Sequence, residues 1–413
     1  MTPDRFSWLR SVGREQWRAL IAAQLGWVLD AMDVMLYAFA LTAIQREFRL
    51  SSGQAGALAS VTLVSSAVGG VLFGVLADRI GRARSLIFSI LVYSIFTTLT
   101  ATAGTILELV LWRSLVGLGM GGEWSAGSVL VSETWPSEHR GKAIGLMQSG
   151  WAIGYILAAV LAAAVLPRYG WRVLFLLGLP PAFFTLWIRR CVREPEIWMK
   201  QARSGLAHRP TFAWEIFRSP LLRKTVVGSI VTLSVLFAYW GLFTWMPSFL
   251  ARPLEQGGAG LGIVKGSAWI ILMQIGAFLG YISFGLFADR FGRRPAFSLF
   301  LAAAAILVPV YGQLARHEVL LLALGPLIGF FGHGYFSVFG VMLSELFPTH
   351  VRGTAQGFVY NVGRAFSALA PYTIGMLADQ YGVGSALAIT SAFFLAGAGL
   401  IFFLPETRGE PLQ

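Results

Sequence analysis

Two aspartates, Asp30 and Asp33, lie in the middle of a long apolar stretch near the start of the chain. A carboxylate at the centre of a membrane-spanning helix costs about 2.5–3.5 kcal/mol even on lenient insertion scales, so such residues are candidates for a function. Their spacing of three residues places both carboxylates on one face of a helix. Because two acids in a poorly hydrated cavity do not both ionise readily at neutral pH, we expect at least one of them to carry a proton. The pair therefore predicts a proton carrier, and a structural pair locked to Arg113 is the alternative.

A basic and an acidic residue share a second apolar stretch further along. Arg113 is followed by Gly117 and Gly121 at a spacing of four residues, so a glycine groove leads along the helix away from the guanidinium. Glu123 follows on the same helix. Arg113 can belong to a proton pathway with these acids, or it can bind the carboxylate of a substrate directly.

A third charged group, Arg364, lies in an apolar stretch of the C-terminal half. Tyr360 and Asn361 precede it by four and three residues and share its helical face. A planar guanidinium binds a carboxylate through two parallel hydrogen bonds, and a neighbouring hydroxyl and amide can fix the orientation. The acids Glu345 and Asp379 lie near the ends of predicted helices, so neither neutralises the arginine from its own half. An uncompensated buried cation predicts an anionic ligand, and a structural hydrogen-bonding role is the alternative.

Further polar and aromatic side chains of the apolar stretches are candidates for substrate contacts: Tyr37, Gln148, Trp151, Tyr239, Trp240, Trp245, Gln274, His333 and Tyr335. Most of them are expected to serve packing or to lie at the membrane interface. Tyr37 follows Asp33 by four residues and therefore faces the same way. His333, between two glycines, can titrate near physiological pH, and a hydrogen-bonded wall residue is the alternative.

The elements that position these residues follow from composition. The chain has 413 residues, of which 56% are hydrophobic and only 13% are charged, and its mean hydropathy is +0.67. Apolar stretches of about 18–25 residues recur, long enough to cross a hydrocarbon core of roughly 30 Å. They predict an all-α integral membrane protein with twelve transmembrane helices, at residues 19–42, 54–76, 86–104, 107–131, 143–166, 171–189, 225–249, 266–287, 296–314, 319–343, 354–377 and 385–404.

The net charge of +12 predicts an orientation rather than binding to nucleic acid. With the N-terminus in the cytoplasm, most of the 32 Lys and Arg residues fall on cytoplasmic segments, as the positive-inside rule requires, and twelve crossings return the C-terminus to the same side. We expect no signal peptide, since the N-terminal segment lacks a short apolar region with a small-residue cleavage site before the first stretch. The single cysteine, Cys191, excludes a disulfide framework within the chain. We expect no cofactor and no metal site, and we expect a monomer in a lipid bilayer.

Short phrases recur in the same order along the chain. GVLADRIGRAR begins at Gly74 and GLFADRFGRRP at Gly285, and SETWPSEHRG returns as SELFPTHVRG. Pro195-Glu196 and Pro405-Glu406 form a third pair. Because the similar phrases recur in the same order and at a nearly constant separation along the chain, they predict a duplicated six-helix unit. The expected domains are two six-helix bundles, residues 1–189 and 225–413, joined by a cytoplasmic linker over 190–224.

The repeated phrases also predict a latch at the cytoplasmic face. In each phrase a glycine, Gly74 or Gly285, is expected to let helices approach closely, and an aspartate ends the helix. The arginines are expected to reach carboxylates or lipid phosphates nearby and so hold one conformation shut. The residues of this latch are Asp78, Arg79, Arg82, Glu133, Arg140, Asp289, Arg290, Arg293, Glu345 and Arg352. Arginines that only fix topology are the alternative.

These motifs resemble those of the major facilitator superfamily over essentially the whole chain. The G-x-x-x-D-R-x-G-R phrases resemble its loop signature, the pairs Glu133/Arg140 and Glu345/Arg352 its charged cytoplasmic pairs, and LPETRG its sugar-porter-like C-terminal signature. QWRALIAAQLGWVLDAMDVMLYAF, RSLVGLGMGGEW and FVYNVGRAFSALAP resemble the metabolite:proton symporters, in particular the sialate:proton symporter branch. The resemblance implies that helices 1, 4, 7 and 10 line a central path. It also assigns Arg113 to the proton pathway.

The expected function is proton-coupled symport of a small organic anion, a monocarboxylate or related metabolite, by alternating access in a bacterial inner membrane. The alternative is a neutral sugar transporter, or an exporter of hydrophobic compounds, in which the buried charges serve only gating. A membrane-embedded enzyme or receptor is not supported. The sequence has no phosphate-binding loop, no nucleophile elbow and no cluster of cysteine and histidine ligands.

Overall fold

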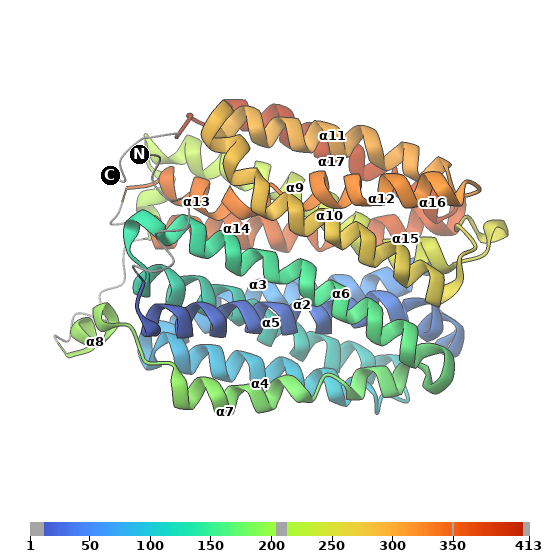
Figure 1. Ribbon diagram of the computed structural model, residues 1–413, viewed down its shortest axis with the longest axis horizontal. Coiled ribbons are helices and arrows are strands. Elements are labelled where there is room, and N and C mark those ends of the chain that lie inside the picture. Colours follow the sequence, from blue (N-terminus) through green and yellow to red (C-terminus); the bar gives the residue numbers. More distant parts are fainter. Residues whose placement is uncertain (1–11, 204–212, 349–350, 408–413) are drawn as a thin grey trace, which may run out of the picture.

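The computed structural model describes residues 12–203, 213–348 and 351–407. Figure 1 shows long helices running side by side along the longest axis of the molecule, with the blue-to-green helices on one side and the yellow-to-red helices on the other. The N-terminal half comprises α2 (Arg14–Phe48), α3 (Ser52–Ile80), α4 (Arg82–Thr100), α5 (Ile106–Thr134), α6 (Ser137–Leu176) and α7 (Pro180–Cys191).

The C-terminal half begins after the short helix α8 (Glu196–Arg203) and η2 (Ala213–Phe217). Its long helices are α9 (Leu221–Ala251), α10 (Gly262–Phe291) and α11 (Arg293–Gln313), with η3 (Leu254–Gln256) between the first two. Shorter helices complete it: α12 (Glu318–His333), α13 (Phe336–Glu345), α14 (Arg352–Ser367), α15 (Leu369–Tyr381), α16 (Val383–Leu387), α17 (Ile389–Leu400) and η4 (Ile401–Phe403).

The all-helical membrane fold is confirmed. Within the described residues, eight helical segments are long and apolar enough to cross a membrane. Of the other predicted stretches, the fourth lies in the continuous helix α5, which contains Arg113 and Glu123, and the remaining ones coincide with breaks in the helical backbone. Gly170, with φ of 74°, separates the fifth and sixth stretches inside α6. The tenth stretch divides into α12 and α13, and the eleventh into α14 and α15.

Local sequence signals explain where the helices of the N-terminal half begin and how closely they pack. Ser51 and Thr105 each form a capping box, which satisfies exposed backbone N–H groups at the start of α3 and α5. The predicted glycine groove of α5 is confirmed, because a Cβ at Gly117 or Gly121 would collide with backbone carbonyls of α3. These glycines bring α5 against α3 and thereby place Arg113 in the interior.

The predicted close approach at Gly74 and Gly285 is wrong, because a Cβ at either position would have no neighbour within 4 Å. The second glycine of each phrase is the structural one. Gly81 and Gly292 have φ of 114° and 98°, which disfavours any other residue, and each ends one helix and begins the next. The repeated phrase therefore encodes a tight turn rather than a helix contact.

Candidate functional site

Five charged side chains lie buried in the interior, each no more than 2% exposed. Helix α2 provides Asp30 and Asp33, helix α5 provides Arg113 and Glu123, and helix α14 of the other half provides Arg364. The first two helices pack against each other, and both N-terminal acids face inward as their spacing predicted. The structure therefore brings the charges singled out in the sequence into one region between the halves.

The arginine of α5 belongs to a group within the N-terminal half. Its guanidinium lies 4.8 Å from the centre of the Tyr37 ring, and it interacts electrostatically with Asp33. The Tyr37 hydroxyl donates a hydrogen bond to the Ala55 carbonyl at 2.8 Å. The hydroxyl is therefore occupied by the backbone of α3, and the face of the tyrosine ring is what supports Arg113.

Arg364 faces acids from the other half. It interacts electrostatically with both Asp30 and Glu123. Its guanidinium lies 5.9 Å from the Tyr360 ring, and that ring stacks on Trp124 at 4.2 Å with an angle of 11° between the planes. The prediction that no acid of its own half neutralises Arg364 agrees with the described residues, and the acids that face the arginine come from the other half. The spacing of residues within one half does not reveal acids that the other half provides.

The two groups are linked but not neutralised by direct pairing. Within the described residues, none of the five charged side chains forms an ion pair with another. In the described part of the chain, hydrogen-bond partners are also missing for both oxygens of Asp30, for Oε2 of Glu123, and for Nε of Arg113 and Arg364. Buried polar atoms of native proteins are nearly always satisfied, so unpaired atoms here indicate places for protons, water or a ligand.

Aromatic rings surround the path between the halves. The Trp151 ring of α6 lies 4.8 Å from Trp27 of α2 and 5.9 Å from Trp240 of α9. Tyr239 accepts a hydrogen bond from the Trp151 indole and lies 3.3 Å from Nε2 of His333. The Nδ1 atom of that histidine lies 3.1 Å from the Gly329 carbonyl. The geometry matches the alternative of a hydrogen-bonded wall residue for His333.

The amide candidates differ in their surroundings. Gln274 of α10 is fully buried and neither atom of its amide has a partner in the described part of the chain, and Oε1 of Gln148 is also unpaired. Asn361 instead donates to the Gly357 carbonyl at 2.9 Å, and its side chain lies against Gly70 of α3. Gln148 and Gln274 are therefore open to a ligand, whereas Asn361 fixes the contact between α14 and α3.

Sequence reasoning missed Trp27 and Trp124 as members of the site. Trp27 precedes Asp30 by three residues, so helical spacing could have placed it on the same face. Trp124 follows Glu123 directly, and its stack on Tyr360 comes from the opposite half, which spacing within one helix does not reveal.

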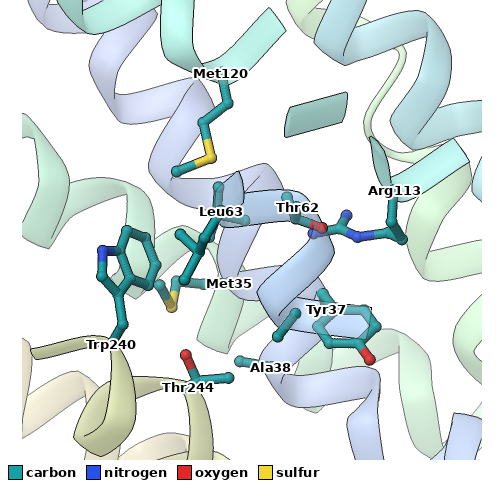
Figure 2. A pocket seen from close by; sticks show the side chains of 11 residues that line it. Met35, Tyr37, Ala38, Thr62, Leu63, Arg113, Met120, Trp240 and Thr244 are labelled. Carbon is teal, nitrogen blue, oxygen red and sulfur yellow. The ribbon is translucent and has the colours of Figure 1, made fainter. Parts of the chain in front are cut away.

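A small cavity lies beside Arg113. Figure 2 shows Arg113, Thr62 and Tyr37 on one side of it and Trp240 and Thr244 of α9 on the other. Its volume of about 20 Å³ holds roughly one water molecule and no substrate. In this conformation, the part of the interface next to Arg113 is therefore closed around it.

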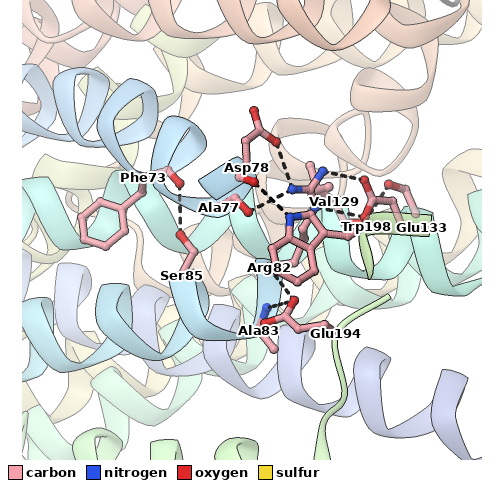
Figure 3. A network of polar contacts seen from close by, with 11 residues as sticks. Phe73, Ala77, Asp78, Arg82, Ala83, Ser85, Val129, Glu133, Glu194 and Trp198 are labelled. Atoms are coloured by element: carbon pink, nitrogen blue, oxygen red, sulfur yellow. Dashed lines mark hydrogen bonds and ion pairs between the residues drawn. The ribbon is translucent and has the colours of Figure 1, made fainter. Parts of the chain in front are cut away.

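The repeated phrase forms a polar network where α3 ends and α4 begins (Figure 3). Arg82 pairs with Glu133 at 2.9 Å and with Asp78 at 3.0 Å. Glu194, after α7, accepts hydrogen bonds from the backbone N–H groups of Arg82, Ala83 and Arg84 at 2.6–3.1 Å. Glu194 therefore caps α4 and ties α7 to it.

The C-terminal half repeats this network. Arg293 pairs with Glu345 at 2.7 Å, and Glu406 accepts from the backbone N–H groups of Arg293 and Arg294 at 3.0 and 3.1 Å. The counterpart of Glu406 is thus Glu194, and the pairing of Pro195-Glu196 with Pro405-Glu406 is wrong by two residues. Arg79 and Arg290 are exposed. The side chains of Arg140, Asp289 and Arg352 lie outside the described part of the structure.

We call the end of the bundle that carries these networks, where α2 begins and η4 ends, the terminal end (Figure 1). At the opposite, distal end the two halves bind each other directly. The carboxylate of Asp379 in α15 accepts from the backbone N–H groups of Ser52 and Gly53 at 2.8 and 2.9 Å. Arg252, after α9, donates to Gln45 and to the Ser52 hydroxyl. None of these distal contacts was predicted from the sequence.

The pKa of Asp379, which follows the eleventh predicted span, reflects this contact. Partial burial alone would raise the pKa of the carboxyl, but the hydrogen bonds from Gly53 and Ser52 hold it below its usual value. Asp379 is therefore ionised near neutral pH and binds the positive end of the α3 helix dipole.

Comparison with known proteins finds relatives that match nearly the full length. The chain is 36% identical over 416 residues to a Cupriavidus pinatubonensis protein named "Probable 4-methylmuconolactone transporter", covering 99% of this chain and 95% of that protein. It is 32% identical over 412 residues to the cis,cis-muconate transport protein of Acinetobacter baylyi, covering 97% and 98%. It is 30% identical over 392 residues to the sialic acid transporter NanX of Escherichia coli, covering 94% of each.

The solved structure of a D-xylose-proton symporter has the same fold, with a TM-score of 0.75 at 20% sequence identity, over 96% of this chain and all of that one. The model of the Major Facilitator Superfamily matches residues 25–283 and 259–413. The relatives are transporters over their full length, and no enzyme is among those described. The chain belongs to the major facilitator superfamily and is a membrane transporter.

Proposed function

We propose that this transporter carries a small organic anion together with protons by alternating access in a bacterial inner membrane. The observation that supports it best is the unpaired buried charge between the halves, where Arg364 faces Asp30 and Glu123 without forming an ion pair. A guanidinium in this position suits a substrate carboxylate. The terminal end, where α2 begins and η4 ends, would face the cytoplasm, and the protein would act as a monomer.

Coupling would follow from competition for Arg364. While Asp30 and Glu123 are ionised, their charges hold the guanidinium electrostatically. When one of them binds a proton, the attraction weakens and the carboxylate of a substrate can take its place. One proton with one monoanion moves no net charge, so the driving force would be the pH gradient, worth about 1.4 kcal/mol per unit.

Asp33 and Arg113 would connect this exchange to the conformational change. They lie on the same two helices as Asp30 and Glu123, and Arg113 borders the small cavity that both halves close. A change in the charge of Asp33 alters its attraction for Arg113 and hence the packing of α5 at the interface. This gives the N-terminal half a way to respond to protonation.

The relatives and the aromatic walls support the substrate class. By their names, two relatives transport cis,cis-muconate and sialic acid, both of which are anions at neutral pH. Aromatic rings from both halves, including Trp124 and Tyr360, provide contact area for a carbon skeleton beside the guanidinium.

The networks at the two ends would have different roles, and only the distal one would latch the halves together. At the terminal end, Arg82–Glu133 and Arg293–Glu345 hold helices within each half. At the distal end, Asp379 and Arg252 hold the halves together. Alternating access would require the distal contacts to break when the outside of the path opens.

A direct test is binding of cis,cis-muconate, benzoate and D-xylose to the purified protein by calorimetry at pH 6 and pH 8. We expect an acid to bind, more tightly at pH 6, and D-xylose not to bind. Binding of D-xylose with no binding of either acid would instead support the neutral sugar transporter.

A further inference from the structure

Three tryptophans form a cluster next to the charged residues. Trp151 lies between Trp27 and Trp240, with ring centres 4.8 and 5.9 Å away, and the three side chains come from both halves. Their exposed fractions are 6%, 5% and 3% for Trp27, Trp240 and Trp151. Trp27 shares a face of α2 with Asp30 and lies three residues before it, roughly 4.5 Å along the helix axis. The cluster is thus about one helical turn from the acid that faces Arg364.

The indole N–H groups of this cluster are unequally used. Trp151 donates to the Tyr239 hydroxyl. The Nε1 atoms of Trp27 and Trp240 are buried and have no partner among the described residues. An indole N–H can only donate, and buried donors in native proteins are nearly always paired. Each of these two free donors, on rings that both contact Trp151, therefore indicates a place for an acceptor atom of a ligand.

Tyr239 and His333 hold the middle ring in place. Because Trp151 can only donate, the Tyr239 oxygen accepts from it and directs its own hydrogen toward Nε2 of His333, 3.3 Å away. The Gly329 carbonyl can only accept, so Nδ1 of His333 carries the hydrogen in their 3.1 Å contact. The chain of bonds requires a neutral imidazole. The Trp151 N–H is used in this chain, so the available donors of the cluster are those of Trp27 and Trp240. His333 acts as a positioning residue, because it holds Tyr239 and thereby Trp151.

We propose that Trp27 and Trp240 bind a second polar group of the transported acid, a carbonyl oxygen, while its carboxylate lies at Arg364. The inference rests on the proposed function and makes its substrate class narrower. Because the cluster provides uncharged donors, a neutral carbonyl suits it better than a second anion. Trp27 lies about one helical turn along α2 from Asp30, the acid that faces Arg364, so the acid would carry its carbonyl at the end away from its carboxylate.

Matched probes separate the two subsites. We would measure binding of 4-formylbenzoate and 4-methylbenzoate to the purified full-length protein by calorimetry, since the two acids have similar size and only the first has a second acceptor. We expect 4-formylbenzoate to bind about tenfold more tightly. Trp27→Phe and Trp240→Phe keep an aromatic ring and remove the donor, so each is expected to reduce this preference and leave 4-methylbenzoate binding nearly unchanged.

Trp187→Phe is the matched control, because Trp187 stacks on Phe184 in the outer helix α7 and lies outside the site. It should retain the full preference. Equal affinities of the wild-type protein for the two probes, or a full preference retained by the Trp27→Phe/Trp240→Phe double variant, would overturn the carbonyl subsite. Failure of both acids to bind, or binding unaffected by Arg364→Lys, would overturn the proposed function as well. Binding of 4-methylbenzoate by the variants shows that they are folded.

Substitutions of His333 test its positioning role. His333→Gln retains an acceptor for the Tyr239 hydroxyl and should keep most of the preference, whereas His333→Leu should lose it. Affinity should change with pH in the same way in both variants and in the wild-type protein between pH 5.5 and 8. A pH dependence that disappears in both variants would show that His333 titrates, and would overturn this assignment.

Discussion

Arg364 of the C-terminal half faces Asp30 of the N-terminal half across the buried interface, and the two interact without forming an ion pair. This relationship joins the two halves electrostatically at the place where a carrier must respond to its substrate. It also gives the acid and the substrate carboxylate a common partner. Binding and protonation are then linked through one guanidinium.

Replacement of Arg364 by lysine tests the carboxylate site. Arg364→Lys keeps the positive charge but cannot form two parallel hydrogen bonds with a carboxylate. We expect acids to bind about ten- to a hundredfold more weakly in calorimetric titrations. Arg252→Lys, at the distal end, is the matched control and should bind acids as the wild type does. Equal affinities of Arg364→Lys and the wild type would assign a structural role to Arg364.

Replacement of Asp30 by asparagine tests the competition. If one proton must bind for each acid bound, the wild-type dissociation constant should rise up to tenfold per pH unit between pH 6 and 8. Asp30→Asn removes one competing charge, so the pH dependence should become weaker while binding persists. A wild-type slope retained in full by both Asp30→Asn and Glu123→Gln would exclude these acids as the linked groups.

Glu194 and Glu196 test the terminal network. Glu194→Ala removes the acceptor for three backbone N–H groups at the start of α4, and a lost helix cap costs about 1–2 kcal/mol. Glu196 lies two residues away, is exposed and pairs with Lys200 at 4.0 Å. We expect Glu194→Ala to lower the thermal unfolding temperature and Glu196→Ala to leave it unchanged. Equal effects of the two substitutions would refute the capping role.

Asp379 tests the distal latch and its pH dependence. Because the pKa of this carboxyl is lowered when the distal end is closed, its contribution is present above its ordinary value near 3.9 and is lost only as the pH falls below that. Asp379→Asn should therefore speed the labelling of a cysteine introduced at the distal end by a similar factor at pH 5, 6.5 and 8. An effect of the substitution that disappears at pH 5 would show that the carboxyl is already protonated there.

Much of the fold could be predicted from the sequence because each signal was local. Apolar stretches of sufficient length predict membrane helices, and the glycines of α5 predict close packing against a neighbour. The break at Gly170 agrees with the predicted boundary between the fifth and sixth stretches. The breaks between α12 and α13 and between α14 and α15 were not predictable, since the hydropathy of these stretches is continuous. The correspondence of Glu194 with Glu406 was also missed, because the neighbouring proline follows Glu194 in the first half but precedes Glu406 in the second.

The sequence was sufficient to predict which charged residues belong to the site, but not which of them face each other. Burial cost singled out Asp30, Asp33, Arg113 and Arg364, and each is buried. Which acid faces which arginine depends on how the halves pack, and no spacing within one helix determines that. The distal contacts of Asp379 were missed for the same reason, since an acid at a helix end resembles any solvent-exposed carboxylate until its partner from the other half is known.

Proton movement driven by a substrate gradient tests the central claim most directly. In proteoliposomes that contain an internal pH dye and start without a pH gradient, external cis,cis-muconate or 4-formylbenzoate should acidify the interior faster than in protein-free liposomes. Asp33→Asn should lose this acidification and still exchange labelled substrate across the membrane. Labelled acid that enters through the wild-type protein with no acidification beyond the protein-free control would contradict proton-coupled transport.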